Sequence, residues 1–166
     1  DNKILFSVGF AKNYEAPQNK KSLLGKIIAI DLTSKNYELV SYGHRNPQGL
    51  YFNEEKNIII NTEHGPKGGD EINFNFLDLE EDKNFGWPRV SYGNAYQGED
   101  HFFEKDTFKR GHKELGFIEP HKYYDPSIGI SEVIYLENNS LCVSKCFWIS
   151  SLRANSIYNL NINDDF

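Results

Sequence analysis

The chain of 166 residues has no methionine, only two cysteines and no long apolar run. Because translation starts at methionine, we expect residue 1 to lie in a processed protein or in part of a longer one. No apolar run approaches the roughly 20 residues of a membrane-spanning helix, and no basic-then-apolar leader opens the chain, so we expect no membrane span. The net charge of -6 argues against a nucleic-acid partner, which favours a basic face.

The two cysteines, Cys142 and Cys146, lie four residues apart. Within a single strand this spacing corresponds to about 13 Å, beyond the roughly 7 Å between Cα atoms that a disulfide tolerates. Two sulfurs without a matching Cys/His pair are also too few for a zinc site. We therefore predict that both cysteines are packing residues.

Aromatic residues make up 14% of the chain and glycines are scattered along it, a composition that favours strands over helices. Short segments rich in β-branched or aromatic residues recur, and each predicts a strand: 3–9, 25–32, 37–41, 49–52, 57–61, 71–76, 132–136, 147–150 and 156–162. In one of them Ile72, Phe74 and Phe76 alternate and share a face. The polar stretches 10–24 and 93–117 have no convincing period and are interpreted as long excursions.

The predicted strands form about three successive groups, each the size of a small sheet. Such groups are typical of β-propeller blades, each of which needs a neighbour to cover its faces. A closed propeller has roughly 4–8 blades of four strands, and about ten strands cannot close one. We therefore predict an all-β fold, a partial β-propeller of about three blades that forms a single incomplete domain over residues 1–166.

Five blocks punctuated by glycine or proline lie between the strands: 43–50, 63–66, 68–73, 84–88 and 91–93. This pattern puts polar and charged side chains on turns while apolar residues form the scaffold, which is how a site is built on a rigid sheet. A packed core has no need of a His-Arg-Asn triplet or a Gly-Gly-Asp-Glu turn. The block 84–88, with Phe85 and Trp87, is interpreted as mostly structural.

The block 43–50 contains Arg45 and Asn46, directly after a predicted strand. Arg45 offers a planar fork of donors suited to a carboxylate or a polarised carbonyl oxygen, and Asn46 adds amide contacts. The alternative is a structural arginine that binds loop carbonyls.

In the next block, Gly65 and Pro66 have no side-chain chemistry, but their carbonyl oxygens suit a hard cation such as calcium. Asp70 lies close enough in sequence to add negative charge or to order this loop. The alternative is a tight turn followed by solvated acidic residues, with His64 an ordinary loop histidine.

Taken together and in this order, the blocks 43–50, 63–73 and 84–88 resemble the glucose/sorbosone dehydrogenase family, soluble sugar dehydrogenases that depend on pyrroloquinoline quinone (PQQ). The resemblance runs across nearly the whole chain and is looser over 126–160. It implies a six-bladed β-propeller with PQQ and calcium in its central cleft, an aldose sugar as substrate, and a periplasmic or secreted location. It leaves the electron acceptor, the sugar specificity and the oligomeric state undefined.

The resemblance also implies roles for single residues. By motif position, Arg45 contacts PQQ or the substrate and has a catalytic role, and the carbonyls of Gly65 and Pro66 ligate calcium. Arg153 falls where the family usually has a cofactor-binding lysine, which keeps the charge but changes its geometry. The implied cofactor-binding residues are Asn46, His64, Asp70 and Arg153.

Two departures from the family pattern keep other functions open. The family's general base, a histidine, lies upstream of the matching part, and Phe10 stands where the family commonly has aspartate. The leading hypothesis is therefore part of a sugar dehydrogenase that is inactive by itself. The alternatives are a non-enzymatic binding propeller and a calcium-dependent carbohydrate-binding module.

Overall fold

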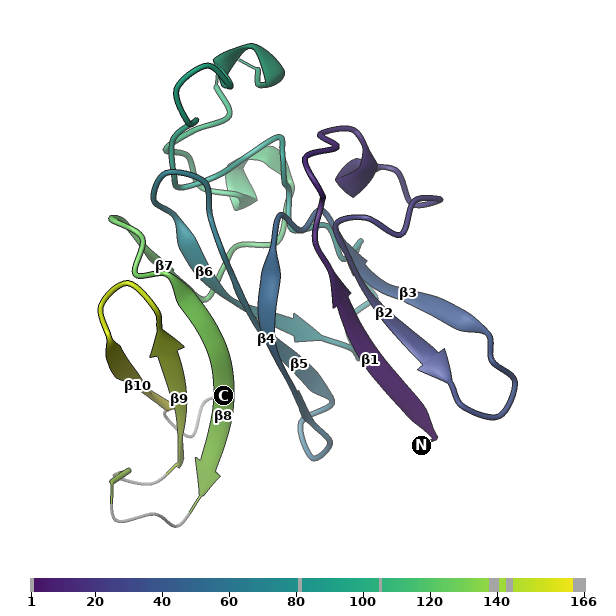
Figure 1. The fold of residues 1–166 in the computed structure, drawn as a ribbon. Helices are drawn as coiled ribbons and strands as arrows, with labels where there is room; N and C mark the ends of the chain where they lie inside the picture. The colour runs from purple at the N-terminus through teal and green to yellow at the C-terminus, as the bar shows by residue number, and fades with distance from the viewer. Residues whose placement is uncertain (1, 81, 105, 138–140, 143–144, 163–166) are drawn as a thin grey trace.

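The computed structural model describes residues 2–80, 82–104, 106–137, 141–142 and 145–162, which form three antiparallel sheets (Figure 1). The first sheet has the order β1-β2-β3 and the second β4-β5-β6-β7, whereas the third runs β10-β9-β8. Their bounds are β1 Lys3–Val8, β2 Lys26–Asp31, β3 Tyr37–Tyr42, β4 Pro47–Asn53, β5 Ile58–Glu63, β6 Asp70–Phe76, β7 Lys122–Tyr124, β8 Ile130–Glu137, β9 Lys145–Ser151 and β10 Ser156–Ile162. The prediction of an all-β, partial propeller of about three blades is confirmed.

Helical structure in the described residues is limited to three short 3-10 turns, at Ala16–Gln18, Asp100–Phe102 and Lys113–Leu115. None of the helices in this described part of the chain has the length and apolarity that crossing a membrane requires.

The main core lies between the second and third sheets. Ile58 and Ile60 of β5 pack there with residues of β6, β8 and β9, and β5 is buried along its whole length. Strand β5 is rich in isoleucine because β-branched residues favour strands and apolar ones suit a strand that is covered on both faces. The remaining buried members of this core are Ile72, Phe74, Ile128, Ile130, Val133, Phe147 and Ile149.

The alternation predicted for β6 is only part of the pattern. Ile72 and Phe74 lie in the core, but Phe76 at the strand end is 42% exposed. Asn73 and Asn75, on the opposite face, are buried as well. The second sheet therefore covers an apolar interior on one face and a polar one on the other.

The prediction for the cysteines is wrong, because Cys142 and Cys146 form a disulfide. They do not share a strand: Cys142 lies in the connection between β8 and β9, and Cys146 is within β9. Their Cα atoms lie 5.9 Å apart, within the range of a disulfide.

The loops that follow β3, β5 and β9 lie at the same end of their sheets, together with the two long excursions (Figure 1). Lys26, at the start of β2, holds the first excursion in place. Its buried ammonium donates to the carbonyls of Ala16, Pro17 and Leu24 at 2.9, 3.0 and 2.7 Å. The scaffold thus places loops from different sheets next to one another.

Candidate active site

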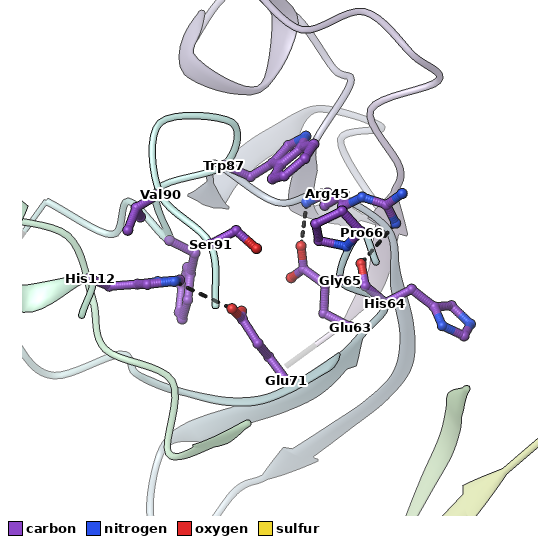
Figure 2. Close-up of a pocket in the computed structure, with 11 residues that line it drawn as sticks. Arg45, Glu63, His64, Gly65, Pro66, Glu71, Trp87, Val90, Ser91 and His112 are labelled. Carbon is purple, nitrogen blue, oxygen red and sulfur yellow. Dashed lines mark hydrogen bonds and ion pairs between the residues drawn. The ribbon is translucent and has the colours of Figure 1, made fainter. Parts of the chain in front are cut away.

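A pocket lies where the loops after β3 and β5 meet the segment that follows β6 (Figure 2). All five glycine- or proline-punctuated blocks supply lining residues, and the second excursion supplies one histidine. The lining residues are Arg45, Glu63, His64, Gly65, Pro66, Glu71, Phe85, Trp87, Val90, Ser91 and His112.

Arg45 forms one wall of this pocket and is held from several sides. Its Nη1 donates to the carbonyl of His64 at 3.0 Å, and its guanidinium lies 5.5 Å from the ring centre of Phe10 and 5.3 Å from that of Trp87. Burial lowers the pKa of Arg45 from its usual value, but a guanidinium stays protonated in proteins. Arg45 therefore brings a fixed positive charge and a rigid set of donors to the pocket.

Glu63, the last residue of β5, fixes the backbone of the Arg45 loop. One carboxylate oxygen accepts from the backbone N–H of Arg45, and the other lies 2.8 Å from Nδ1 of the buried His44. Nε2 of His44 lies in turn 2.8 Å from Oγ of Ser41, and its ring stacks on Phe85 at 4.6 Å. This chain of contacts ties the loop to two sheets.

The backbone of the Gly65–Pro66 loop is folded too tightly for a side chain at its first residue. A Cβ on Gly65 would collide with the carbonyl oxygens of Gly68 and Gly69, which have φ angles of +93° and +70°. Pro66 presents its carbonyl oxygen to the hydroxyl of Tyr96, which donates to it at 3.3 Å. At Gly65 the loop can therefore offer only backbone groups, and the Pro66 carbonyl is within reach of a donor.

Behind this loop, a second acidic residue faces a histidine. Glu71 Oε1 lies 3.4 Å from Nε2 of His112, and Asn73 Nδ2 donates to both Glu71 and Glu63, at 3.3 and 3.4 Å. Burial raises the pKa of Glu71 well above its usual range, and the nearby charge of Glu63 adds to the effect. Burial lowers the pKa of His112, so both groups favour their neutral forms.

The sequence-predicted residues are only partly gathered here. Arg45, His64, Gly65 and Pro66 line the pocket, although the imidazole of His64 turns away from Glu63 in Figure 2. The other three predicted residues, Asn46, Asp70 and Arg153, do not line it.

The three predicted residues outside the pocket contact other parts of the backbone. The backbone carbonyl of Asn46 accepts from the His64 N–H at 3.1 Å. Asp70 is 1% exposed and accepts from the Gly65 N–H at 3.1 Å. Arg153 is exposed in the turn after β9, where its Nη1 donates to the carbonyl of Ser127 at 3.1 Å.

Sequence reasoning missed Trp87, Ser91 and His112 as pocket residues. Trp87 was interpreted as a structural aromatic, and its indole does pack on Phe10 at 5.5 Å while it also faces Arg45. His112 falls in an excursion with no period, so the sequence carried no signal that would place it beside Glu71.

Comparisons with known proteins match most of the chain to one family of dehydrogenases. The model of the Glucose / Sorbosone dehydrogenase family matches residues 1–165. The aldose sugar dehydrogenase YliI of Escherichia coli (strain K12) is 31% identical over 129 residues, which are 77% of this chain and 32% of that protein. The chain therefore spans well under two thirds of the length of this relative.

Two solved structures share the fold. The apo form of the soluble aldose sugar dehydrogenase from Escherichia coli has a TM-score of 0.78 at 24% identity, covering 99% of this chain and 49% of that one. The PQQ-bound form of an aldose sugar dehydrogenase from Streptomyces coelicolor has a TM-score of 0.69 at 20% identity, covering 98% and 42%. Since the family model accounts for all but the last residue, the chain belongs to the glucose/sorbosone dehydrogenase family.

Proposed function

We propose that this chain is part of a PQQ- and calcium-dependent sugar dehydrogenase that oxidises aldoses by hydride transfer to PQQ. One observation carries the proposal: the guanidinium of Arg45 is hydrogen-bonded to the loop that presents the Gly65 and Pro66 carbonyls. A fixed cation beside a cluster of backbone oxygens suits an anionic cofactor bound together with a hard metal ion. The PQQ-bound Streptomyces coelicolor protein, which has this fold, supports the choice of cofactor.

The residues present fit a calcium ion in part. Calcium takes six to eight oxygen ligands, and backbone carbonyls are among those it accepts. The collapsed turn at Gly65, which admits no side chain, leaves the backbone as the donor there, and Pro66 adds a second carbonyl. We assign these two carbonyls to the metal, with the cofactor and water supplying the other ligands. Bound together, PQQ and calcium would supply a polarised quinone that accepts hydride.

The protein residues would bind and orient the reactants. Arg45 donates hydrogen bonds toward the oxygen on which negative charge develops, and its fixed position lets it act without reorganisation. The guanidinium makes cation–π contacts with the rings of Trp87 and Phe10, which restrict its position. We assign cofactor contacts to Asn46 and His64, and to Arg153 as a cation on the third sheet.

We place the general base outside these 166 residues. His44 and His112 are buried, at 0% and 1% exposure, and each faces a glutamate instead of open space. His64 lines the pocket but turns its ring away from Glu63 and Glu71 (Figure 2). A base must come within hydrogen-bond reach of the sugar hydroxyl, and none of these three histidines is placed for that task.

The disulfide between Cys142 and Cys146 supports a periplasmic or secreted location, because structural disulfides persist in oxidising compartments.

The test is calorimetric titration of the protein with PQQ, with calcium present and after chelation. We expect tight binding with calcium, loss of most of the affinity on chelation, and a loss of roughly tenfold or more for Arg45→Ala. Arg89→Ala is the matched control, because Arg89 is exposed, close in sequence to Trp87, and does not line the pocket. Binding that ignores chelation would refute the metal assignment, and binding of calcium and sugar without PQQ would favour a carbohydrate-binding module.

A further inference from the structure

Asp70 joins two loops that belong to different sheets. Its Oδ1 accepts from the N–H of Gly65 at 3.1 Å, in the loop after β5. Its Oδ2 accepts from the N–H groups of Gly129 and Ile130, at 2.8 and 3.0 Å, where the chain enters β8. One buried carboxylate thus receives three backbone hydrogen bonds, and such charge-assisted bonds are about twice as strong as neutral ones.

On the side of the second sheet, Asp70 and Arg45 hold opposite ends of one peptide group. The carbonyl of His64 accepts from Arg45 Nη1 at 3.0 Å, and the N–H of Gly65, in the same peptide, donates to Asp70. The orientation of this peptide sets the direction in which the following carbonyls point. Asp70 therefore helps to fix the oxygens that we assign to calcium.

On the side of the third sheet, the bonded segment carries the turn of Arg153. The N–H of Arg153 donates to the carbonyl of Ile128 at 3.1 Å, and that of Leu152 donates to Gly129 at 2.8 Å. A Cβ on Gly129 would lie 3.0 Å from the backbone nitrogen of Arg153, so the two turns are in direct contact. A shift of Gly129 is therefore passed to Arg153.

The sheets themselves do not depend on Asp70 to stay together. Ile58, Ile60, Ile130 and Phe147 already pack the second sheet on the third. Two of the three N–H groups that Asp70 binds belong to loops, at Gly65 and Gly129, and the third opens β8. Its role is thus to set loop positions at the end of the molecule that carries the candidate site.

From this geometry we propose that Asp70 is a positioning residue that couples the Gly65–Pro66 loop to the Arg153 turn. A cation at the carbonyls and an anionic group at Arg153 then bind with positive cooperativity, each ordering the loop that the other needs. This inference rests on the proposed function for the identity of the two ligands. Linkage makes the coupling reciprocal: calcium raises the affinity for PQQ by the factor by which PQQ raises that for calcium.

The first experiment titrates the wild-type protein with calcium alone and follows backbone amide resonances by NMR. We expect the amides of Gly65, Gly129 and Arg153 to shift with one midpoint. If Gly65 responds and Gly129 does not, the coupling is refuted while the metal assignment stands. If the amide resonance of Gly65 does not shift, both the metal assignment and the coupling are refuted.

The second experiment measures calcium affinity with and without PQQ in Asp70→Asn, which keeps the shape but presents a single acceptor oxygen. We expect the gain in calcium affinity caused by PQQ to be about 5- to 150-fold in the wild type and several-fold smaller in the variant, where only the direct contact of PQQ with the metal still couples the two ligands. Ile72→Val, a buried change on the same strand whose side chain has no hydrogen-bonding atoms, is the control for lost stability and should keep the gain. Equal gains in Asp70→Asn and the wild type would overturn the proposal.

Discussion

Glu71 and His112 form a buried acid–imidazole pair in the wall of the candidate site, 3.4 Å apart. Ionising Glu71 would put a second negative charge near Glu63, because Asn73 donates to both carboxylates, whereas the neutral forms of Glu71 and His112 add no charge to this buried region. The raised pKa of Glu71 and the lowered pKa of His112 agree with that neutral state.

This pair predicts a pH dependence of stability. Because burial raises the pKa of Glu71, the folded protein binds that proton more tightly than the unfolded chain. The stability that protonated Glu71 contributes is complete below the pKa of this group in the unfolded chain. It is lost as the pH rises through the pKa of the group in the folded protein. Glu71→Gln cannot ionise, so this loss of stability does not occur in the variant. Between pH 5 and pH 8 the free energy of unfolding of the variant should therefore rise by about 1 kcal/mol or more relative to that of the wild type. Urea unfolding at several pH values measures the difference.

Glu80→Gln is the control for that experiment, since it removes one negative charge from an exposed position. Wild-type and Glu71→Gln stability curves that stay parallel across the pH range would contradict the assignment of a neutral Glu71.

Lys26 gives a second prediction for a single side chain. Lys26→Met keeps most of the volume but leaves three carbonyl groups without their donor, which should cost about 1–3 kcal/mol. Burial lowers the pKa of Lys26 to about 8, so between pH 8 and pH 10 the unfolded chain binds this proton more tightly than the folded protein. The free energy of unfolding of the wild type should therefore rise further above that of the variant over this range. Chemical unfolding and proteolysis of the segment 10–24 are the measurements. The exposed Lys21→Met is the control, and equal stability of both variants would count against the interpretation.

Among the elements, β5 is buried along its whole length because both of its faces are covered. Ile60→Ala should lower the free energy of unfolding by about 2–5 kcal/mol, since it leaves a cavity between two sheets. Ile157→Ala on β10, where the side chain is 62% exposed, should change it by less than about 0.5 kcal/mol. Denaturant melts of the two variants test whether the core lies where the structure places it, and similar losses would show that it does not.

The sequence predicted those elements whose pattern is local. Runs such as Ile58–Ile60 identify strands by composition alone, and the turn glycines mark where they end. The short β7 was missed because three residues, Lys122 to Tyr124, give no period, and their strand character comes from pairing with β6. The disulfide was missed for a related reason: a separation in sequence was converted into a distance by assuming one straight strand.

The sequence predicted the part of the pocket wall that lies in short motifs. Arg45 and the Gly65–Pro66 loop could be found because their residue types have no use in a core. His112 could not, since its place beside Glu71 depends on how an excursion of irregular sequence folds back over the second sheet. Distant contacts of this kind leave no mark in a single sequence.

The molecule as a whole exposes apolar side chains on its outer sheets. Ile4 and Phe6 on β1 are 42% and 44% exposed, and Ile134 on β8 is 47% exposed. Clusters of this kind favour association, as do unpaired strand edges. Residues 1–166 produced alone should therefore self-associate and bind a hydrophobic dye, and Phe6→Lys should reduce both effects. Light scattering across a concentration series is the measurement, and a monodisperse monomer at all concentrations would contradict it.

The same 166 residues should not oxidise aldoses when supplied with PQQ and calcium, because we place the general base that accepts the hydroxyl proton outside them. Reduction of an artificial electron-accepting dye, with several aldoses, measures this. Turnover above that of a protein-free control would show that one of the five histidines serves as the base after all.

The turn between β4 and β5, residues 54–57, lies at the end of the second sheet opposite to the loops of the candidate site (Figure 1). Glu54, Glu55 and Lys56 are exposed there, and none of them lines the pocket. A cysteine introduced at Glu55 is therefore a suitable attachment point for a spectroscopic label or an electrode surface. Immobilised through that turn, the protein would keep its pocket open to the solution.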